Sequence, residues 1–135
     1  MKVMVLVKAT KNSEAGVTPD PQQVEEMAKF NDQLARAGIL LTGEGLAPSS
    51  TGKRVRFSGQ SRSVIDGPFS ETKELLGGFW FWEVKSMEDA VDWLKRAPFD
   101  GGTEVEIRPF SDHCRVSDQV RDSLSRHRGA HPPSA

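Results

Sequence analysis

Four consecutive aromatic residues at positions 79–82 constrain the fold more than any other stretch of the sequence. Successive side chains of a strand point to opposite faces, so two aromatic rings project from each side of this segment. Both of its faces must therefore be shielded from water. Residues 2–8 are also apolar on both faces, which is typical of a strand at the centre of a sheet.

A first helix is predicted from Asp20 to about residue 37, after a polar loop at residues 9–19. Asp20 is a favoured capping residue, Pro21 suits the first helical position, Gln23 is the capping-box partner and Gly38 ends the helix. The periodicity of 3.6 residues places an apolar stripe on one face and charged residues on the other. The predicted stripe comprises Val24, Met27, Ala28, Phe30, Leu34 and Ala35, with Asn31 inside it.

The remaining elements complete a regular order. A second helix is predicted to begin after Ser86 and to end at Pro98, and strands are expected at about residues 39–46, 76–84 and 103–110. Residues 53–58 and 62–66 read as a hairpin that turns at Gly59 and Gln60.

The order of strand, helix, strand, hairpin, strand, helix and strand predicts an α+β fold of the ferredoxin-like split βαβ type with an inserted β-hairpin. The first and third major strands are central in this topology, and these two are apolar on both faces. Two helices can cover only one face of such a sheet. We therefore expect a second copy of the chain to cover the other, aromatic face, which makes the protein a homodimer.

Length and charge narrow the function classes. The chain of 135 residues suggests one domain, residues 1–112, followed by a polar C-terminal tail, residues 113–135, in which Val116, Val120 and Leu124 have the spacing of a weak amphipathic helix. Its net charge of −1 provides no field that would attract nucleic acid. No apolar run reaches the roughly 20 residues of a membrane span, and the N-terminal run is too short for a signal peptide. A cytoplasmic protein is expected, and the single Cys114 excludes an intramolecular disulfide.

Several motifs, in one order, connect the chain to a known family. They are GEGL at 43–46, DGPF at 66–69, ETKE at 71–74, GG at 77–78 and EIRP at 106–109. Through them the chain resembles the DGPF-type branch of the YCII-related proteins over residues 1 to about 110. The resemblance implies a dimeric α+β barrel, in which two ferredoxin-like sheets face each other and enclose a pocket. It is silent on activity, although DGPF-type relatives are often encoded near extracytoplasmic-function sigma factors.

One position departs from the family pattern. The broader YCII-related group usually carries a histidine on its first helix, paired with an acidic residue as a catalytic dyad. Met27 stands at the corresponding position here, and the first histidine of the chain is His113. We therefore expect no histidine-based acid or base catalysis within the barrel, and any activity would rest on a carboxylate.

Asp66 is the first-choice functional residue. It stands at a strand end before Gly67 and Pro68, where its carboxylate can serve a ligand or, alternatively, cap the turn that follows. Glu44 lies between two glycines, which allow close approach of a ligand or relieve crowding in a bent strand. Arg108 can bind a substrate carboxylate or join an ion-pair network in the interface.

Three further candidates have equally plain structural alternatives. Glu71 and Lys73 share one short charged turn, which either binds a ligand or is a solvated face. Asn31 is either a satisfied buried amide or a ligand contact.

The sequence has no phosphate loop, dinucleotide fingerprint or nucleophile elbow, so no cofactor is predicted. His127 and His131 have helical spacing, but Gly129 between them opposes a helix, so no metal site is predicted.

Two function classes follow from these residues. The first is a small-molecule binder or enzyme that uses the pocket enclosed by the dimeric barrel, with Asp66, Arg108 and Glu44 as polar groups. The second is a regulatory or interaction protein without catalysis, whose surface meets a partner such as a sigma factor. The residues alone do not choose between them.

Overall fold

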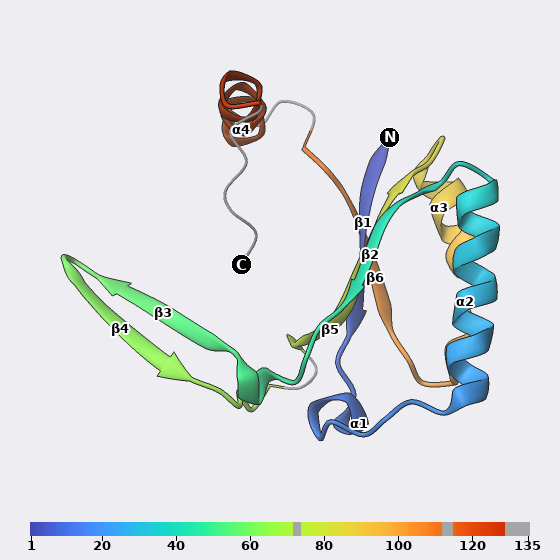
Figure 1. Ribbon diagram of the computed structural model, residues 1–135, viewed down its shortest axis with the longest axis horizontal. Coiled ribbons are helices and arrows are strands. Elements are labelled where there is room, and N and C mark those ends of the chain that lie inside the picture. Colours follow the sequence, from blue (N-terminus) through green and yellow to red (C-terminus); the bar gives the residue numbers. More distant parts are fainter. Residues whose placement is uncertain (72–73, 112–114, 129–135) are drawn as a thin grey trace.

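The computed structural model describes residues 1–71, 74–111 and 115–128. A four-stranded sheet carries two helices on one face, and a two-stranded hairpin projects from it (Figure 1). In chain order the elements are β1 (Lys2–Lys8), α1 (Lys11–Glu14), α2 (Pro21–Arg36), β2 (Leu40–Gly45), the 3₁₀ turn η1 (Ser49–Thr51), β3 (Lys53–Ser58), β4 (Ser61–Asp66), β5 (Leu76–Glu83), α3 (Met87–Leu94), β6 (Val105–Pro109) and α4 (Arg115–Arg126).

The sheet has the strand order β2-β5-β1-β6, and each neighbouring pair is antiparallel. This order is the ferredoxin-like arrangement, so the predicted α+β fold is confirmed. The two strands that are apolar on both faces, β1 and β5, are the central ones. Val5 pairs with Trp80 of β5 on one side and with Ile107 of β6 on the other.

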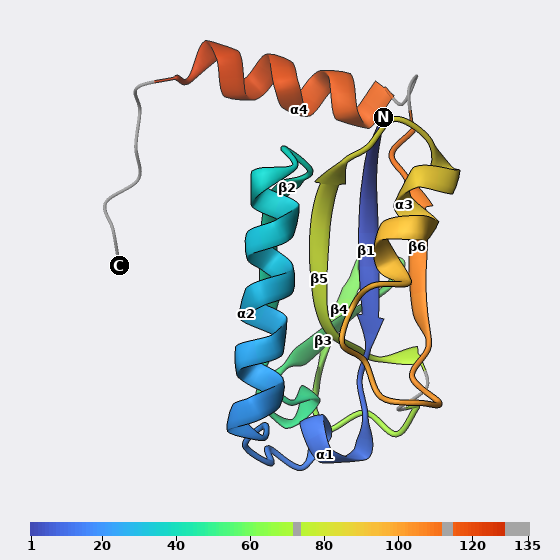
Figure 2. The same ribbon diagram turned by 90° about the vertical axis from the view of Figure 1, so that its right-hand side faces the viewer.

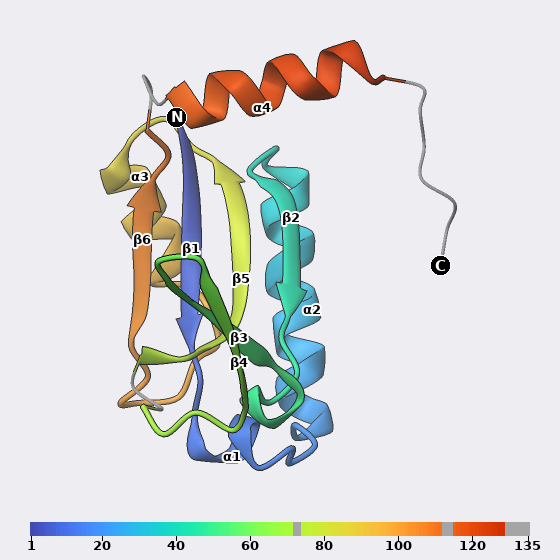
Figure 3. The ribbon, with the colours of Figure 1, turned by 90° about the vertical axis from the view of Figure 1, so that its left-hand side faces the viewer.

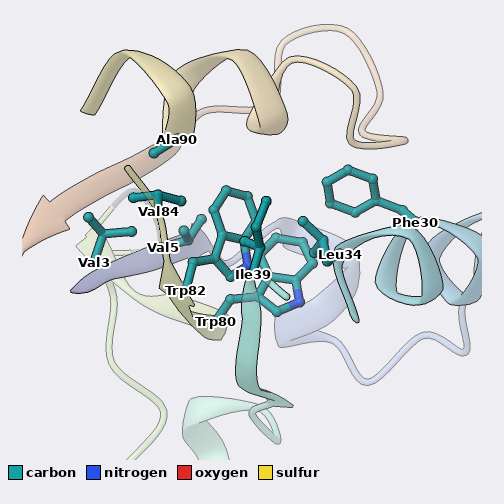
Figure 4. Packing of buried hydrophobic residues seen from close by; sticks show 9 residues of the cluster. All are labelled: Val3, Val5, Phe30, Leu34, Ile39, Trp80, Trp82, Val84 and Ala90. Atoms are coloured by element: carbon teal, nitrogen blue, oxygen red, sulfur yellow. The ribbon is translucent and has the colours of Figure 1, made fainter. Parts of the chain in front are cut away.

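The core lies between the sheet and its two helices (Figures 2 and 4). Trp80 and Trp82 of β5 point toward the helices, and Phe30 of α2 meets Trp80 edge-on with ring centroids 5.9 Å apart. The buried cluster comprises Val3, Val5, Phe30, Leu34, Ile39, Trp80, Trp82, Val84 and Ala90. The aromatic run thus places its tryptophans in the core of the chain and its phenylalanines on the opposite face.

Helix α2 buries a narrower stripe than predicted. Phe30 and Leu34 are buried and Met27 is half-buried. Val24, however, is 54% exposed, and Ala28 and Ala35 are exposed as well. These three residues lie on one flank of the stripe, beyond the side of the helix that meets the sheet. Asp20 caps the helix as predicted, although its carboxylate accepts from the amide of Gln22 rather than from Gln23.

A short helix replaces part of the predicted polar loop. The prediction of a loop throughout residues 9–19 is wrong, because α1 forms at its start. The Ser13 amide donates to Thr10 Oγ1 at 3.0 Å, and the Thr10 amide donates to Ser13 Oγ at 2.8 Å. This reciprocal pair is a capping box, which stabilises even a single helical turn.

The face of the sheet that carries no helix is apolar, and we call it the open face. Met4 and Leu6 of β1 point to it, as do Phe79 and Phe81 of β5, since they alternate with the core residues. Phe110 extends the patch, with its ring centroid 5.3 Å from that of Phe81. The β3–β4 hairpin and α4 both protrude on this side of the sheet (Figures 1 and 3).

The hairpin and the tail helix complete the described chain. Strands β3 and β4 turn at Gly59 and Gln60 as predicted, and Gly59 adopts a φ of 57°. Helix α4 exposes Val116, Val120 and Leu124 along one stripe. None of the described helices combines the length and the apolar character needed to cross a membrane.

Candidate functional site

A cavity of about 310 Å³ lies between α2 and the adjoining strands β2 and β5. Its walls are mostly apolar side chains and glycine backbone. The lining residues are Val7, Met27, Asn31, Leu40, Gly43, Glu44, Gly45, Gly78, Phe79, Trp80 and Phe99. This volume is at the lower end of the range of small-molecule sites, and an apolar wall with few polar groups is typical of them.

The polar centre of the cavity is a side-chain pair. The indole Nε1–H of Trp80 donates to Asn31 Oδ1 at 2.9 Å, which fixes the orientation of the amide. Gly43 lies so close to the indole that an added Cβ would be 2.5 Å from Trp80 Cδ1. A glycine on β2 therefore lets the Trp80 ring reach Asn31.

The structure brings two of the predicted site residues together at this cavity. Asn31 and Glu44 both line it, from α2 and β2. Arg108 lies on the open face instead, with its Nε 3.7 Å from Glu106 Oε2, while Lys8 Nζ lies 3.4 Å from the other oxygen of Glu106. These contacts form a small ion-pair network around Arg108 within one chain.

The other predicted residues lie outside the cavity. Asp66 ends β4, where its carboxylate pairs with Lys53 Nζ at 2.5 Å and its side chain is 73% exposed. The register of the hairpin explains this pairing, because Lys53 and Asp66 are directly opposite. Glu71 is exposed, and Lys73 lies outside the described residues. A ligand role for these residues stays a prediction.

Comparison with known proteins places the chain in a family. Residues 1–111 match the family described as YCII-related domain. The chain belongs to the YCII-related family. A protein of Rhizobium meliloti (strain 1021) that is described as uncharacterized is 30% identical to it over 95 residues, which cover 68% of this chain and 76% of that relative.

Met27, the residue expected where the broader YCII-related group carries a histidine, lies in the cavity wall. Met27 lines the cavity from α2, one turn before Asn31. Glu44 is the one ionisable residue among the described residues of its lining, and its pairing with Phe79 turns its side chain to the open face. No three His, Cys, Asp or Glu side chains within the described ranges lie close enough to hold a metal ion.

Sequence reasoning missed a hydrogen-bonded relay at the base of the hairpin. The Glu14 carboxylate accepts from the Ser49 amide at 2.7 Å and also from the Ser49 hydroxyl. The same hydroxyl oxygen accepts from the Phe69 amide at 3.0 Å. This relay ties α1, η1 and the DGPF corner together. The partners are 35 and 20 residues apart in the chain, so no local pattern indicates them.

The relay predicts a specific dependence of stability on acid. Hydrogen bonds from the side chain and the backbone amide of Ser49 hold the pKa of the Glu14 carboxyl below its ordinary value. Because this pKa is lower in the folded state, the Glu14 carboxylate stabilises the fold at pH values above its pKa in the unfolded chain, about 4.3. This contribution to the free energy of unfolding is lost as the pH falls through the pKa of the folded state. The free energy of unfolding of Glu14→Gln, measured in urea at a series of pH values, is therefore expected to fall less in acid than that of the wild type.

Glu25→Gln is the matched control for this measurement. Glu25 is an exposed residue of α2 whose contact is a helical pair with Lys29. Its variant is expected to keep the acid profile of the wild type. A Glu14→Gln profile that runs parallel to the wild type between about pH 3 and 5 would show that the relay does not depend on the carboxylate.

Proposed function

We propose that this YCII-related protein binds a small organic molecule in the cavity beside α2. The observation that supports the proposal is the cavity itself, with its apolar wall and a single oriented amide. Because Asn31 Oδ1 already accepts from Trp80, the two N–H groups of the amide serve as donors toward a ligand. The expected ligand has an apolar body and a hydrogen-bond acceptor such as a carbonyl or carboxylate oxygen.

Binding is favoured over catalysis by the composition of the wall. With Met27 in place of a histidine, the one ionisable residue of the described lining is Glu44, and its side chain points to the open face, away from the Asn31 amide. Glu44 is exposed and pairs with Phe79, so its carboxylate lies on the open-face side of β2 and not beside the Asn31 amide.

The proposed assembly is a homodimer in which the open faces of two copies meet. Apolar residues of β1 and β5 form that face, and a patch of this kind on a stable protein normally contacts another chain. Two sheets that face each other would form the barrel that the family resemblance implies. The pocket between them would then include Arg108 and its ion-pair network, in addition to the cavity within each chain.

The second candidate function is a regulatory interaction without catalysis, with a sigma factor as the partner suggested by resemblance. The open face supports this candidate as well, because it is suited to a protein partner. The two functions differ in what they require of the cavity, which only the first one uses.

Two probe molecules of similar shape test the cavity. Acetophenone carries a carbonyl acceptor and ethylbenzene does not, and binding of each is followed through the indole N–H signal of Trp80 in NMR spectra. In the wild type both are expected to shift this signal, with acetophenone bound more tightly. Asn31→Asp keeps the acceptor for Trp80 but removes the amide donors. It should therefore lower the affinity for acetophenone by about two- to tenfold and leave the affinity for ethylbenzene unchanged.

Two variants complete the design. Met27→Phe is expected to fill the cavity and weaken the binding of both probes. Asp32→Asn changes the exposed residue next to Asn31, whose partner is Arg36, and is expected to bind both probes as the wild type does. If neither probe shifts the Trp80 signal, or if Asp32→Asn and Asn31→Asp behave alike, the proposed binding function is wrong.

A further inference from the structure

The β3–β4 hairpin exposes an apolar face. Val55 pairs with Val64 across the two strands and Phe57 pairs with Arg62, so these four side chains share one face. Phe57 is 69% exposed and Val64 is 64% exposed, although the Arg62 guanidinium lies 4.5 Å from the centre of the Phe57 ring. Three large apolar side chains on one side of a narrow hairpin are an unusual feature for a surface in contact with water.

The rest of the chain supports only the base of this hairpin. Strands β3 and β4 pack chiefly on each other, and they extend away from the four-stranded sheet (Figure 1). A two-stranded hairpin alone is marginally stable in water. The Gly67 amide continues the ladder by donating to the Gly52 carbonyl at 3.0 Å, and the relay of Phe69, Ser49 and Glu14 ties the base of the hairpin to α1.

The hairpin projects on the side of the open face. Figure 1 shows it opposite α2 and α3, and Figure 3 shows it standing in front of the central strands. A second copy that covers the open face would therefore come within reach of the hairpin.

The charge of the hairpin favours this same partner. Residues 53–66 contain four basic residues and one acidic residue, a net charge of +3. The whole chain carries −1, so the remainder carries −4. A basic arm and an acidic body attract each other between two copies of one chain, whereas a neutral hairpin would give no such preference.

We propose that the β3–β4 hairpin is a dimerisation arm, which packs Val55, Phe57 and Val64 against the body of the second copy. This inference rests on the proposed pairing of two copies through their open faces. In a two-fold symmetric dimer each arm would contact the other subunit, so every arm contact occurs twice. The arm would add its apolar face and its charge to the interface formed by the sheets.

Sedimentation equilibrium of the intact protein tests the arm. Phe57→Thr combined with Val64→Thr removes the apolar side chains while keeping residues that favour strands. The dimer dissociation constant is expected to rise about a hundredfold or more, because each substitution removes apolar contacts at two symmetric places in the dimer. Val24→Thr is the control, since Val24 is similarly exposed but lies on α2, and it should leave the constant unchanged. Raising the salt concentration should weaken the wild-type dimer, because screening reduces the attraction between arm and body.

Hydrogen exchange on the wild type provides a second measurement that needs no variant. Amides of residues 53–66 are expected to exchange slowly at protein concentrations where the dimer forms and to lose this protection on dilution. A wild type that stays monomeric at micromolar concentration would overturn both the pairing and the arm. A stable wild-type dimer whose dissociation constant is the same in the double variant, with residues 53–66 unprotected, would overturn the arm alone.

Discussion

Trp82→Ala is expected to reduce the free energy of unfolding by about 3–5 kcal/mol, which is a large part of the 5–15 kcal/mol typical of a domain. Trp82 is fully buried near the end of β5, where it packs beside Trp80 with ring centroids 5.6 Å apart and also meets Phe30. Truncation would leave a large void that the sheet cannot close. Urea unfolding followed by circular dichroism measures the loss, and a change below about 1.5 kcal/mol would mean that the core repacks around the site.

A matched pair of phenylalanine substitutions separates packing from hydrogen bonding in the same core. Trp82→Phe removes an indole N–H that has no hydrogen-bond partner among the described residues, so it loses packing volume but no hydrogen bond, and it relieves the desolvation of that N–H. Trp80→Phe removes the same volume and also the donor to Asn31 Oδ1. We expect Trp80→Phe to cost about 0.5–1.5 kcal/mol more than Trp82→Phe. Equal costs would show that water replaces the indole donor at the cavity.

Gly67→Ala is expected to have the second large effect, a loss of about 1–3 kcal/mol or more. A Cβ at this position would lie 1.8 Å from the carbonyl oxygen of Ser49, the residue whose amide and hydroxyl form the relay at the base of the hairpin. The backbone must move, and the contacts of Ser49 with Glu14 and Phe69 should be lost with it. Hydrogen exchange at the Ser49 and Phe69 amides should therefore accelerate, in addition to the lower stability in urea.

Gly101→Ala is the control for this substitution. A Cβ at Gly101 would meet nothing within 4 Å, and the residue does not have a left-handed φ. Its stability should stay within about 0.5 kcal/mol of the wild type or rise slightly. If Gly67→Ala behaves like this control, then the close approach of Gly67 to Ser49 has no structural role.

Most of the fold could be predicted because its signals are local. The aromatic run and the apolar stretch at residues 2–8 identified β5 and β1 as central strands, since a strand alternates with a period of two. Capping residues and glycine likewise marked the ends of α2. The stripe on α2 was predicted too broadly, because periodicity gives a face but not the width of the contact that the sheet makes with it.

The candidate site depends on contacts between distant parts of the chain. Asn31 was predicted as either a satisfied amide or a ligand contact, and only the structure shows it bonded to Trp80, 49 residues away, at the wall of a cavity. Asp66 looked like a site residue because local reasoning sees a carboxylate at a strand end. Its exposed pairing with Lys53 depends on the hairpin register.

The sequence by itself determined the order of the elements, the identity of the central strands and the place of the turns. These follow from side-chain alternation, helical period and backbone preferences, which act between near neighbours. The tertiary structure decided which polar groups meet, including Asn31 with Trp80 and Glu14 with Ser49. Such pairs form because sheet pairing and helix packing bring remote residues within hydrogen-bond distance, and no interaction between near neighbours in the chain specifies that approach.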